Sequence, residues 1–143
     1  MTESDRQKIL AIADPRKFSR TRYQSPPHNG ATPEVETDCS HFVHDIMNRA
    51  GFEFPYTPTR SFECLRSFKS IPSTQALPGD LIMFSGHVGI LGSDGLIISA
   101  TTGGKNRRSS LDPDDKDFLS SITRLTQDQF GRETPKVIRW SCP

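Results

Sequence analysis

The chain has 143 residues, 33% of them hydrophobic and 24% charged, which suffices for one compact domain and is too short for two ordinary ones. We therefore expect residues 1–143 to form a single domain. A formal net charge of +1 argues against nucleic acid or an anionic membrane as a partner. No apolar run approaches the roughly 20 residues that span a bilayer, and the start M-T-E-S-D-R-Q-K lacks the features of a secretory signal.

The first half of the chain is expected to be mainly helical. We expect a short helix from Ser4 to Ala13, with Ser4 as its N-cap, packed on the main body. The segment from Pro15 to Thr37 is rich in Pro, Gly, Ser and Thr, which predicts an irregular loop of functional importance. Asp38 and Gly51 should begin and end the next helix. Its apolar residues recur at helical spacing: Phe42, Val43, Ile46, Met47 and Ala50.

The second half is expected to be mainly β. Short apolar runs joined by S-G and S-D-G turns predict an antiparallel meander over Asp80–Phe84, His87–Gly92 and Leu96–Ala100. The other expected elements are a short helix at Thr59–Phe68, a strand at Arg107–Leu111, a helix at Asp114–Arg124 and a closing strand at Lys136–Trp140. Helices followed by a sheet make an α+β domain.

Cys39 lies at the start of the second helix, where the first backbone N–H groups have no partner within the helix and the helix dipole favours a thiolate. We therefore interpret Cys39 as a nucleophile whose own backbone N–H serves the oxyanion. His87 follows 87 − 39 = 48 residues later, on an expected central strand. A cysteine taken alone is more often a small buried hydrophobe, but this pair favours cysteine-based acyl chemistry.

Three motifs follow one another in order: D-C-S-x-F-V at Asp38–Val43, L-P-G-D-L-x-x-F at Leu77–Phe84 and H-V-G-I at His87–Ile90. A D-G turn and an apolar strand followed by T-G-G come next. From roughly Tyr23 to Ser110, this order resembles the NlpC-type cell-wall peptidases, the papain-like family of bacterial cysteine amidases. The resemblance implies an α+β fold with a papain-like core, in which the nucleophile helix packs on a small antiparallel sheet. It also implies hydrolysis of an amide bond in a peptidoglycan stem peptide, without a cofactor.

The resemblance places a third catalytic residue at Ser99, where the family usually carries a polar orienting residue, often a second histidine. A hydroxyl can hold the other imidazole nitrogen of His87, but it has no charge to stabilise an imidazolium. Three explanations stay open: Ser99 suffices, another group orients His87, or the protein has lost activity. We prefer the first two and take Cys39, His87 and Ser99 as the candidate catalytic residues.

The same resemblance implies candidate residues that bind the substrate or its oxyanion. Asp38 and Ser40 match the nucleophile motif and are candidate oxyanion or substrate-binding residues, although His41 stands where the family commonly has Gly. Tyr23 lies about where the family places a tyrosine that assists the oxyanion hole.

The remaining polar residues have simpler interpretations. His41 and His44 share a helix with Cys39, but residues two apart on a helix point in different directions, so we expect no metal site. We expect His44 to pack or face solvent. Turns, rather than chemistry, should explain His28, Asp80 and Asp94. Basic residues are expected to form solvated faces at Arg16, Lys17, Arg20, Arg22, Lys105, Arg107 and Arg108.

Three cysteines are an odd number, so at least one thiol is free. Cys64 and Cys142 could form a disulfide in an oxidising compartment while Cys39 stays reactive. The alternative is three reduced thiols, of which two merely pack.

A catalytic domain without an export signal or wall-binding repeats resembles the small amidase effectors that type VI secretion systems inject into the periplasm of rival Gram-negative bacteria. Such a toxin is made in the cytoplasm, and the resemblance implies an immunity protein that protects the producer. The bond cut would be either γ-D-glutamyl to diaminopimelate or the D-alanyl to diaminopimelate cross-link. A phage-tail or lysis amidase is an alternative, as are a non-catalytic domain that binds wall peptides or a protein partner, and a cytosolic cysteine acyl hydrolase.

Overall fold

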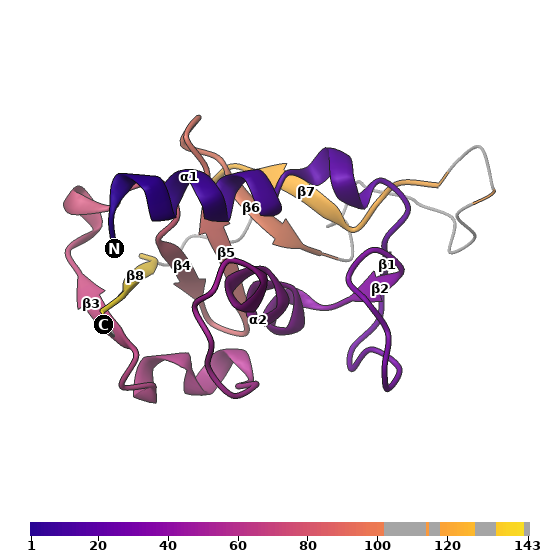
Figure 1. Ribbon diagram of the computed structural model, residues 1–143, viewed down its shortest axis with the longest axis horizontal. Coiled ribbons are helices and arrows are strands. Elements are labelled where there is room, and N and C mark those ends of the chain that lie inside the picture. The colour runs from indigo at the N-terminus through magenta and orange to yellow at the C-terminus, as the bar shows by residue number, and fades with distance from the viewer. Residues whose placement is uncertain (102–113, 115–117, 128–133, 142–143) are drawn as a thin grey trace.

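Six strands form one antiparallel sheet in the computed structural model, which describes residues 1–101, 114, 118–127 and 134–141 (Figure 1). Across the sheet their order is β3-β8-β4-β5-β6-β7. The strands span Phe68–Ile71 (β3), Leu81–Phe84 (β4), His87–Leu91 (β5), Ile97–Ala100 (β6), Ile122–Leu125 (β7) and Lys136–Trp140 (β8). Helices precede the sheet in the chain, so the predicted α+β class is confirmed.

The N-terminal helix α1 spans Glu3–Ile12. Its N-cap is Thr2 rather than the expected Ser4, because the Thr2 hydroxyl accepts from the Asp5 N–H at 3.1 Å and the Asp5 carboxylate accepts from the Thr2 N–H at 2.9 Å. Ile9 is fully buried, so α1 packs on the main body as expected. In the described segments, no helix has the length and apolar character needed to cross a bilayer.

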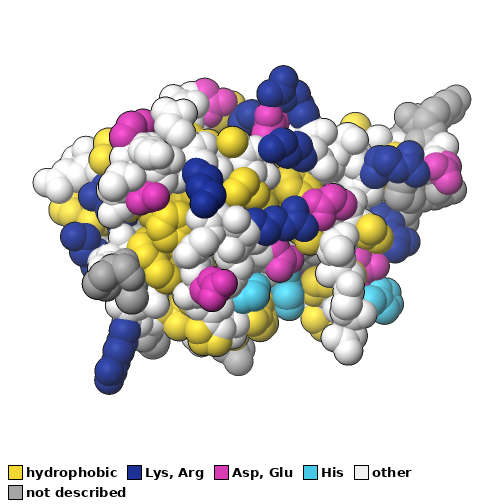
Figure 2. All heavy atoms as spheres, in the orientation of Figure 1, with side chains coloured by type: hydrophobic (Ala, Val, Ile, Leu, Met, Phe, Trp, Pro, Cys, Tyr) yellow, Lys and Arg dark blue, Asp and Glu magenta, His cyan; other side chains and the backbone are white. Residues whose placement is uncertain are grey.

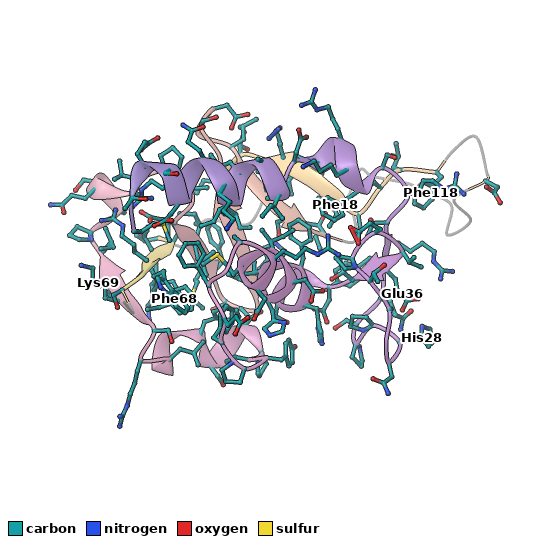
Figure 3. The ribbon with its side chains drawn as sticks, in the orientation of Figure 1. Phe18, His28, Glu36, Phe68, Lys69 and Phe118 are labelled. Atoms are coloured by element: carbon teal, nitrogen blue, oxygen red, sulfur yellow. The ribbon has the colours of Figure 1, made fainter. Side chains whose placement is uncertain are left out.

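The segment expected to be an irregular loop contains some regular structure. A 3-10 helix, η1 (Pro15–Phe18), is followed by β1 (Arg22–Tyr23), which pairs in parallel with β2 (Glu36–Thr37). The intervening loop is tied down by Glu36, whose carboxylate accepts from the backbone N–H of His28 at 2.8 Å and lies 2.7 Å from its Nδ1 (Figure 3). The His28 carbonyl also closes a turn with the N–H of Ala31, as expected for a turn residue. The sequence did not indicate β1 and β2 because each has only two residues.

Helix α2 spans Cys39–Arg49 and confirms the most detailed helix prediction. Asp38 caps it by accepting from the backbone N–H of His41 at 2.9 Å. Gly51 follows with φ of 94°, a left-handed conformation that glycine adopts easily. The apolar face of α2 packs against β5 and β6, and α1 lies beside α2 in front of the strands (Figure 1). The fully buried side chains of α2 are Phe42, Val43, Ile46 and Met47.

Only the first part of the segment Thr59–Phe68, which was expected to be a helix, is helical. A 3-10 helix, η2, covers Thr59–Cys64, whereas Phe68 begins β3 and pairs with Trp140 of β8. Phe68 packs edge-to-face on Trp140 and on Phe54, which favours the strand over a longer helix. A further 3-10 turn, η3 (Ser73–Gln75), leads to β4.

The prediction of a helix at Asp114–Arg124 is wrong for the part of this range that the structure describes. Ile122–Leu125 forms β7 and pairs antiparallel with β6, placing Thr123 opposite Ser99. The acidic residues near Asp114 had suggested a helix start, but pairing with β6 decides the conformation of Ile122–Leu125. The strand expected at Arg107–Leu111 lies outside the described residues.

The predicted meander is confirmed. β4 pairs with β5 and β5 with β6, placing Leu81 opposite Ile90 and Ile90 opposite Ile98. Successive side chains point to opposite faces of the sheet. Ile90 and Ile98 therefore join the core beneath α2, while Ile97 joins a separate cluster on the other face. The S-D-G turn before β6 has Gly95 at φ of 81°.

Asp80 makes the expected local contact and two that the sequence did not indicate. Its carboxylate accepts from the Leu77 N–H at 2.9 Å, which holds the turn before β4. It also pairs at 2.9 Å with Arg6 of α1 and with Arg139 of β8, and it is fully buried. Burial alone would raise the pKa of Asp80, but the hydrogen bonds from Arg139, Leu77 and Arg6 outweigh it and hold the pKa below its ordinary value. The cluster joins the first helix to the last strand.

Candidate active site

The start of α2 presents the thiol of Cys39 beside a hydroxyl. The Cys39 side chain is largely buried, with 7% of the residue exposed. Its Sγ lies 3.5 Å from Oγ1 of Thr59, the first residue of η2. As the first residue of the helix, Cys39 directs its backbone N–H away from the helical hydrogen-bond ladder, where it is available to an oxyanion.

Asp38 is a fully engaged acceptor rather than a free carboxylate. Its Oδ1 accepts from the backbone N–H of His41 at 2.9 Å and from the Ser40 hydroxyl at 3.2 Å, and it lies 2.8 Å from His41 Nδ1. Its Oδ2 accepts from the Ser25 hydroxyl at 3.0 Å. These bonds fix the first turn of α2 against the preceding loop. Ser40 also lies 2.9 Å from the hydroxyl of Tyr56, a residue that the sequence did not single out.

His87 and Ser99 are brought together on neighbouring strands. Nε2 of His87 lies 2.6 Å from Oγ of Ser99, which is fully buried. The Ser99 hydroxyl has one hydrogen and donates it to the Val88 carbonyl at 3.1 Å. In that arrangement Ser99 Oγ accepts the Nε2–H of a neutral His87, and the lone pair of the imidazole is left on Nδ1.

Burial lowers the pKa of His87 to about 4. A charged imidazolium loses its hydration when it is buried, so the neutral ring is favoured. At neutral pH His87 is therefore in the form that can accept a proton. Because β5 begins with His87 and packs against α2, which begins with Cys39, the elements that carry the two residues are in contact.

Gly89 explains why the histidine motif contains a glycine. A Cβ at this position would lie 2.4 Å from Cγ2 of Ile97 and 3.2 Å from Cβ of Ser99. Neither distance is compatible with ordinary packing, so any side chain here would push β6 away. The absence of a side chain at Gly89 thus lets Ser99 reach His87.

Tyr23, the candidate oxyanion residue of the family resemblance, lies on β1 near the start of α2. Its parallel pairing with Thr37 places it next to the residues that lead into α2, and its ring packs against the core cluster that contains Cys39. Burial, followed by the nearby negative charges of Cys39 and Asp38, raises the pKa of Tyr23, so its hydroxyl stays protonated and able to donate.

Two histidines of α2 have contacts that sequence reasoning only partly anticipated. His44 packs edge-to-face on Phe54, and its Nε2 lies 3.0 Å from the Phe54 carbonyl, so it packs, which is the first of the two expected alternatives. His41 stacks on Tyr56 with ring centroids 3.9 Å apart. Among the described residues, no group of three or more His, Cys, Asp or Glu side chains could hold a metal ion.

The N-terminal basic cluster is largely neutralised by carboxylates. Arg16 pairs with Asp14, Arg20 with Asp114 and Arg22 with Glu36. On the face drawn in Figure 2, Lys and Arg side chains are interspersed with Asp and Glu. The other basic cluster, Lys105–Arg108, and the suggested disulfide partner Cys142 lie outside the described residues, whereas Cys39 is a free thiol.

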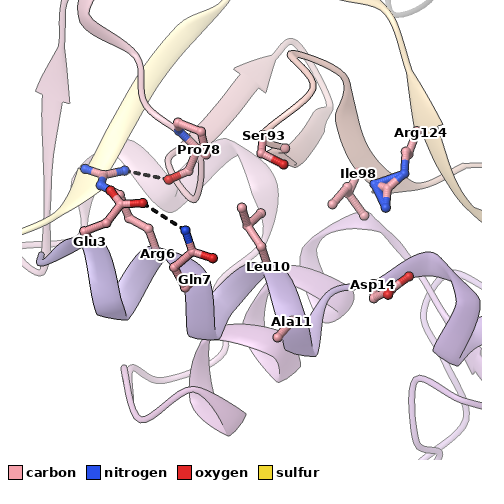
Figure 4. A pocket seen from close by; sticks show the side chains of 11 residues that line it. Glu3, Arg6, Gln7, Leu10, Ala11, Asp14, Pro78, Ser93, Ile98 and Arg124 are labelled. Atoms are coloured by element: carbon pink, nitrogen blue, oxygen red, sulfur yellow. Dashed lines mark hydrogen bonds between the residues drawn. The ribbon is translucent and has the colours of Figure 1, made fainter.

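A hollow of about 330 Å³ lies between α1 and the turn that joins β5 to β6 (Figure 4). Gly92 and Ser93 line it at the end of β5 opposite His87. Its most buried charged residue, Arg6, is already paired with Asp80 and bonded to the Pro78 carbonyl. None of the candidate catalytic residues lines this hollow.

A sequence profile of the NlpC/P60 family matches residues 22–123, which include Cys39, His87 and Ser99. The chain belongs to the NlpC/P60 family. The match spans most of the chain and confirms the resemblance inferred from the three ordered motifs. Comparison with curated proteins gives no match.

Solved NlpC/P60 structures share the fold. The NlpC/p60 domain of the peptidoglycan hydrolase SagA is 22% identical with a TM-score of 0.60, over 96% of this chain and 98% of that one. RipD from Mycobacterium tuberculosis, a non-catalytic NlpC/p60 domain protein adapted to peptidoglycan binding, is 15% identical with a TM-score of 0.59, over 96% and 98%. NlpC2 from Trichomonas vaginalis is 18% identical with a TM-score of 0.63, and the match covers 99% of this chain but 49% of that one. The papain-like fold is thereby confirmed.

Proposed function

We propose that this NlpC/P60 domain is a cysteine amidase or endopeptidase that hydrolyses stem peptides or peptide cross-links of bacterial peptidoglycan. The observation that carries the proposal is the partly buried, neutral imidazole of His87, held by Ser99 at 2.6 Å on a strand packed against the helix that begins with Cys39. Family membership supports the substrate class, since the SagA domain with the same fold belongs to a peptidoglycan hydrolase.

In the proposed reaction, Nδ1 of His87 removes the thiol proton of Cys39, and Sγ attacks the amide carbonyl carbon. The resulting oxyanion accepts hydrogen bonds from the Cys39 backbone N–H and the Tyr23 hydroxyl. His87 then gives its proton to the departing amine, and the acyl group stays on Sγ. Water, deprotonated by His87, attacks this thioester and releases the carboxylate product and the free thiol.

Ser99 has a positioning role in this mechanism. It holds Nε2, so the imidazole keeps one tautomer and one orientation during both proton transfers. A hydroxyl adds no negative charge, so the imidazolium formed in the reaction is less stabilised than beside a carboxylate. His87 is therefore expected to act as a base at the moment of attack rather than to hold a standing ion pair with the thiolate.

The competing function is binding without catalysis. RipD shows that the NlpC/P60 fold also occurs in a non-catalytic, peptidoglycan-binding protein. The free thiol of Cys39 and the His87–Ser99 contact favour catalysis in this chain. A cysteine acyl hydrolase acting on another substrate would use the same residues and is distinguished by the substrate test below.

We also propose that the enzyme is an antibacterial toxin delivered by type VI secretion into the periplasm of Gram-negative cells, and that the producer makes an immunity protein against it. This part rests on the resemblance to small injected amidases. The expected result is lysis of a Gram-negative host that exports the wild-type chain to its periplasm, and no lysis when the chain is Cys39→Ala or stays in the cytoplasm. Harmless periplasmic expression of an active enzyme would argue against a toxin.

Mass spectrometry of purified Gram-negative muropeptides, as monomers and cross-linked dimers, tests the enzymatic proposal. Conversion of dimers to monomers would identify a cross-link endopeptidase, whereas loss of the diaminopimelate end from monomers would identify a γ-D-glutamyl amidase. Cys39→Ala and His87→Ala should each lower the rate by several orders of magnitude. Turnover by Cys39→Ala would overturn the mechanism. No change with the wild type, together with retention on peptidoglycan sacculi, would favour the binding function.

A further inference from the structure

The segment Pro55–Thr59, which leads from α2 to the first residue of η2, contacts the first turn of the nucleophile helix. Two of its hydroxyls contact successive residues of the nucleophile motif. The Tyr56 hydroxyl lies 2.9 Å from the Ser40 hydroxyl, and Thr59 Oγ1 lies 3.5 Å from Cys39 Sγ. Thr59 is buried, with 9% of the residue exposed, so its hydroxyl has little access to water. This segment is therefore part of the wall around the thiol.

We propose that Thr59 is a positioning residue for the nucleophile: its hydroxyl donates a hydrogen bond to the Cys39 thiolate, which stabilises the charged sulfur and fixes the direction of Sγ. The proposal deepens the proposed function, on which it rests. With a neutral thiol, either atom of the pair can donate. A thiolate has no hydrogen and can only accept, so Thr59 must then be the donor.

The charges around the sulfur show why such a donor is useful. Asp38, immediately before Cys39, carries a negative charge that opposes a second anion nearby, although four hydrogen-bonding contacts engage its carboxylate. On β5, the partly buried His87 is neutral and supplies no standing positive charge. From β1 and from the segment after α2, Tyr23 and Tyr56 are neutral phenols whose pKa values are raised, chiefly by burial. Stabilisation of the thiolate therefore falls to the start of α2 and to hydrogen-bond donors, of which Thr59 is a candidate.

Thr57 offers a matched control within the same segment. It is a buried threonine like Thr59, but its hydroxyl donates to the Pro55 carbonyl at 2.9 Å. Thr57→Val removes a buried hydroxyl from the segment and leaves the thiol contact in place. Thr59→Val removes the thiol contact with little change of side-chain shape, and Thr59→Ser keeps the hydroxyl.

The experiment measures the rate at which iodoacetamide alkylates Cys39 as a function of pH, read by mass spectrometry of the Cys39 peptide from the whole folded chain. For Thr59→Val we expect the midpoint of the rate curve to rise by about one pH unit, which lowers the rate at neutral pH about tenfold. The curves for Thr59→Ser and Thr57→Val should stay close to that of the wild type. A Thr59→Val curve that coincides with the wild type, or an equal shift in Thr57→Val, would overturn the proposal.

Alkylation requires no wall substrate, so this result is independent of whether muropeptides are cleaved. If the enzyme cleaves them, the acid limb of its kcat/KM profile should shift in Thr59→Val in the same direction and be restored in Thr59→Ser. Failure of the proposed function would appear as no cleavage by any variant, with the alkylation difference intact. Failure of the Thr59 role would appear as normal cleavage with unshifted curves.

Discussion

The imidazole of His87 and the hydroxyl of Ser99 are joined at 2.6 Å across β5 and β6. The serine is fixed in turn by donating to the Val88 carbonyl, so the histidine is oriented by a hydroxyl whose own direction is set by the backbone. This arrangement supports the first of the three explanations for a serine at this position, in which Ser99 itself orients the base. It also limits what Ser99 can contribute, because a neutral hydrogen bond is weaker than one to a carboxylate.

Ser99→Ala is expected to lower kcat/KM for muropeptide cleavage about fivefold, far less than Cys39→Ala or His87→Ala. The reason is that one neutral hydrogen bond contributes about 1 kcal/mol, which corresponds to about a factor of five in rate. Ser121→Ala is a suitable control, since the buried Oγ of Ser121 has no hydrogen-bond partner in the structure as described. A loss in Ser99→Ala as large as that in His87→Ala would make Ser99 a full catalytic partner.

The stability of the protein should fall as the pH drops from about 6.5 towards 4. His87 has a pKa of about 4 when folded, against 6.5 for an ordinary histidine, so the unfolded chain binds more protons between these values. Its contribution is fully present above pH 6.5 and reaches a loss of about 3 kcal/mol near pH 4. Denaturant unfolding of wild type and His87→Gln across this range measures it. The wild-type curve should be the steeper, and parallel curves would contradict the assignment.

Asp80→Asn is expected to destabilise the fold by about 3–5 kcal/mol. The substitution leaves the buried guanidinium group of Arg6 and the partly buried one of Arg139 beside a neutral partner, and an unpaired buried charge is costly. The pair between Glu34 and Arg49 is a control, because both side chains are substantially exposed and such pairs contribute at most about 1 kcal/mol. Urea unfolding of Asp80→Asn and Glu34→Gln at neutral pH should therefore differ clearly. Equal losses would show that the Asp80 cluster adds little to stability.

The elements that the sequence predicted well are those set by nearby residues. Helix α2 has its N-cap, apolar stripe and terminating glycine within a single stretch of chain, and the β4–β6 meander has its turns between adjacent strands. β7 was mistaken for a helix because its conformation depends on pairing with β6, while the local acidic residues near Asp114 suggested a helix start. β3 was missed for the same reason, since Phe68 pairs with the distant Trp140.

The same distinction between local and distant determinants holds for the residues of the candidate site. Cys39 and His87 lie in ordered motifs, and the family resemblance points to Ser99, so these three candidates could be named from the chain. Tyr56 and Thr59 reach the site from a proline-flanked irregular segment, whose path no periodicity reveals. Only one of the contacts of Asp80 could be predicted from the sequence. Its turn contact with Leu77 is local, whereas its ion-pair partners Arg6 and Arg139 come from the two ends of the chain.

Gly89→Ala is expected to destabilise the fold by about 1–3 kcal/mol and to lower activity more than Ser99→Ala does. The added methyl group would lie 2.4 Å from Cγ2 of Ile97 and 3.0 Å from the Ile98 carbonyl, so β6 must shift, and overpacking of this kind costs energy. The shift carries Ser99 away from His87 and disturbs the base as well as its partner.

A double-mutant cycle with Ile97→Ala separates the packing effect from other causes. Ile97→Ala removes the methyl group that the new Cβ would meet first, so Gly89→Ala should cost less stability in that background than in the wild type. The remaining contact with the Ile98 carbonyl means that some cost persists. Urea unfolding of the four proteins measures the coupling. Strictly additive losses would show that Gly89 is required for a reason other than its close approach to Ile97, and the explanation for the glycine in the histidine motif would have to be sought in the backbone.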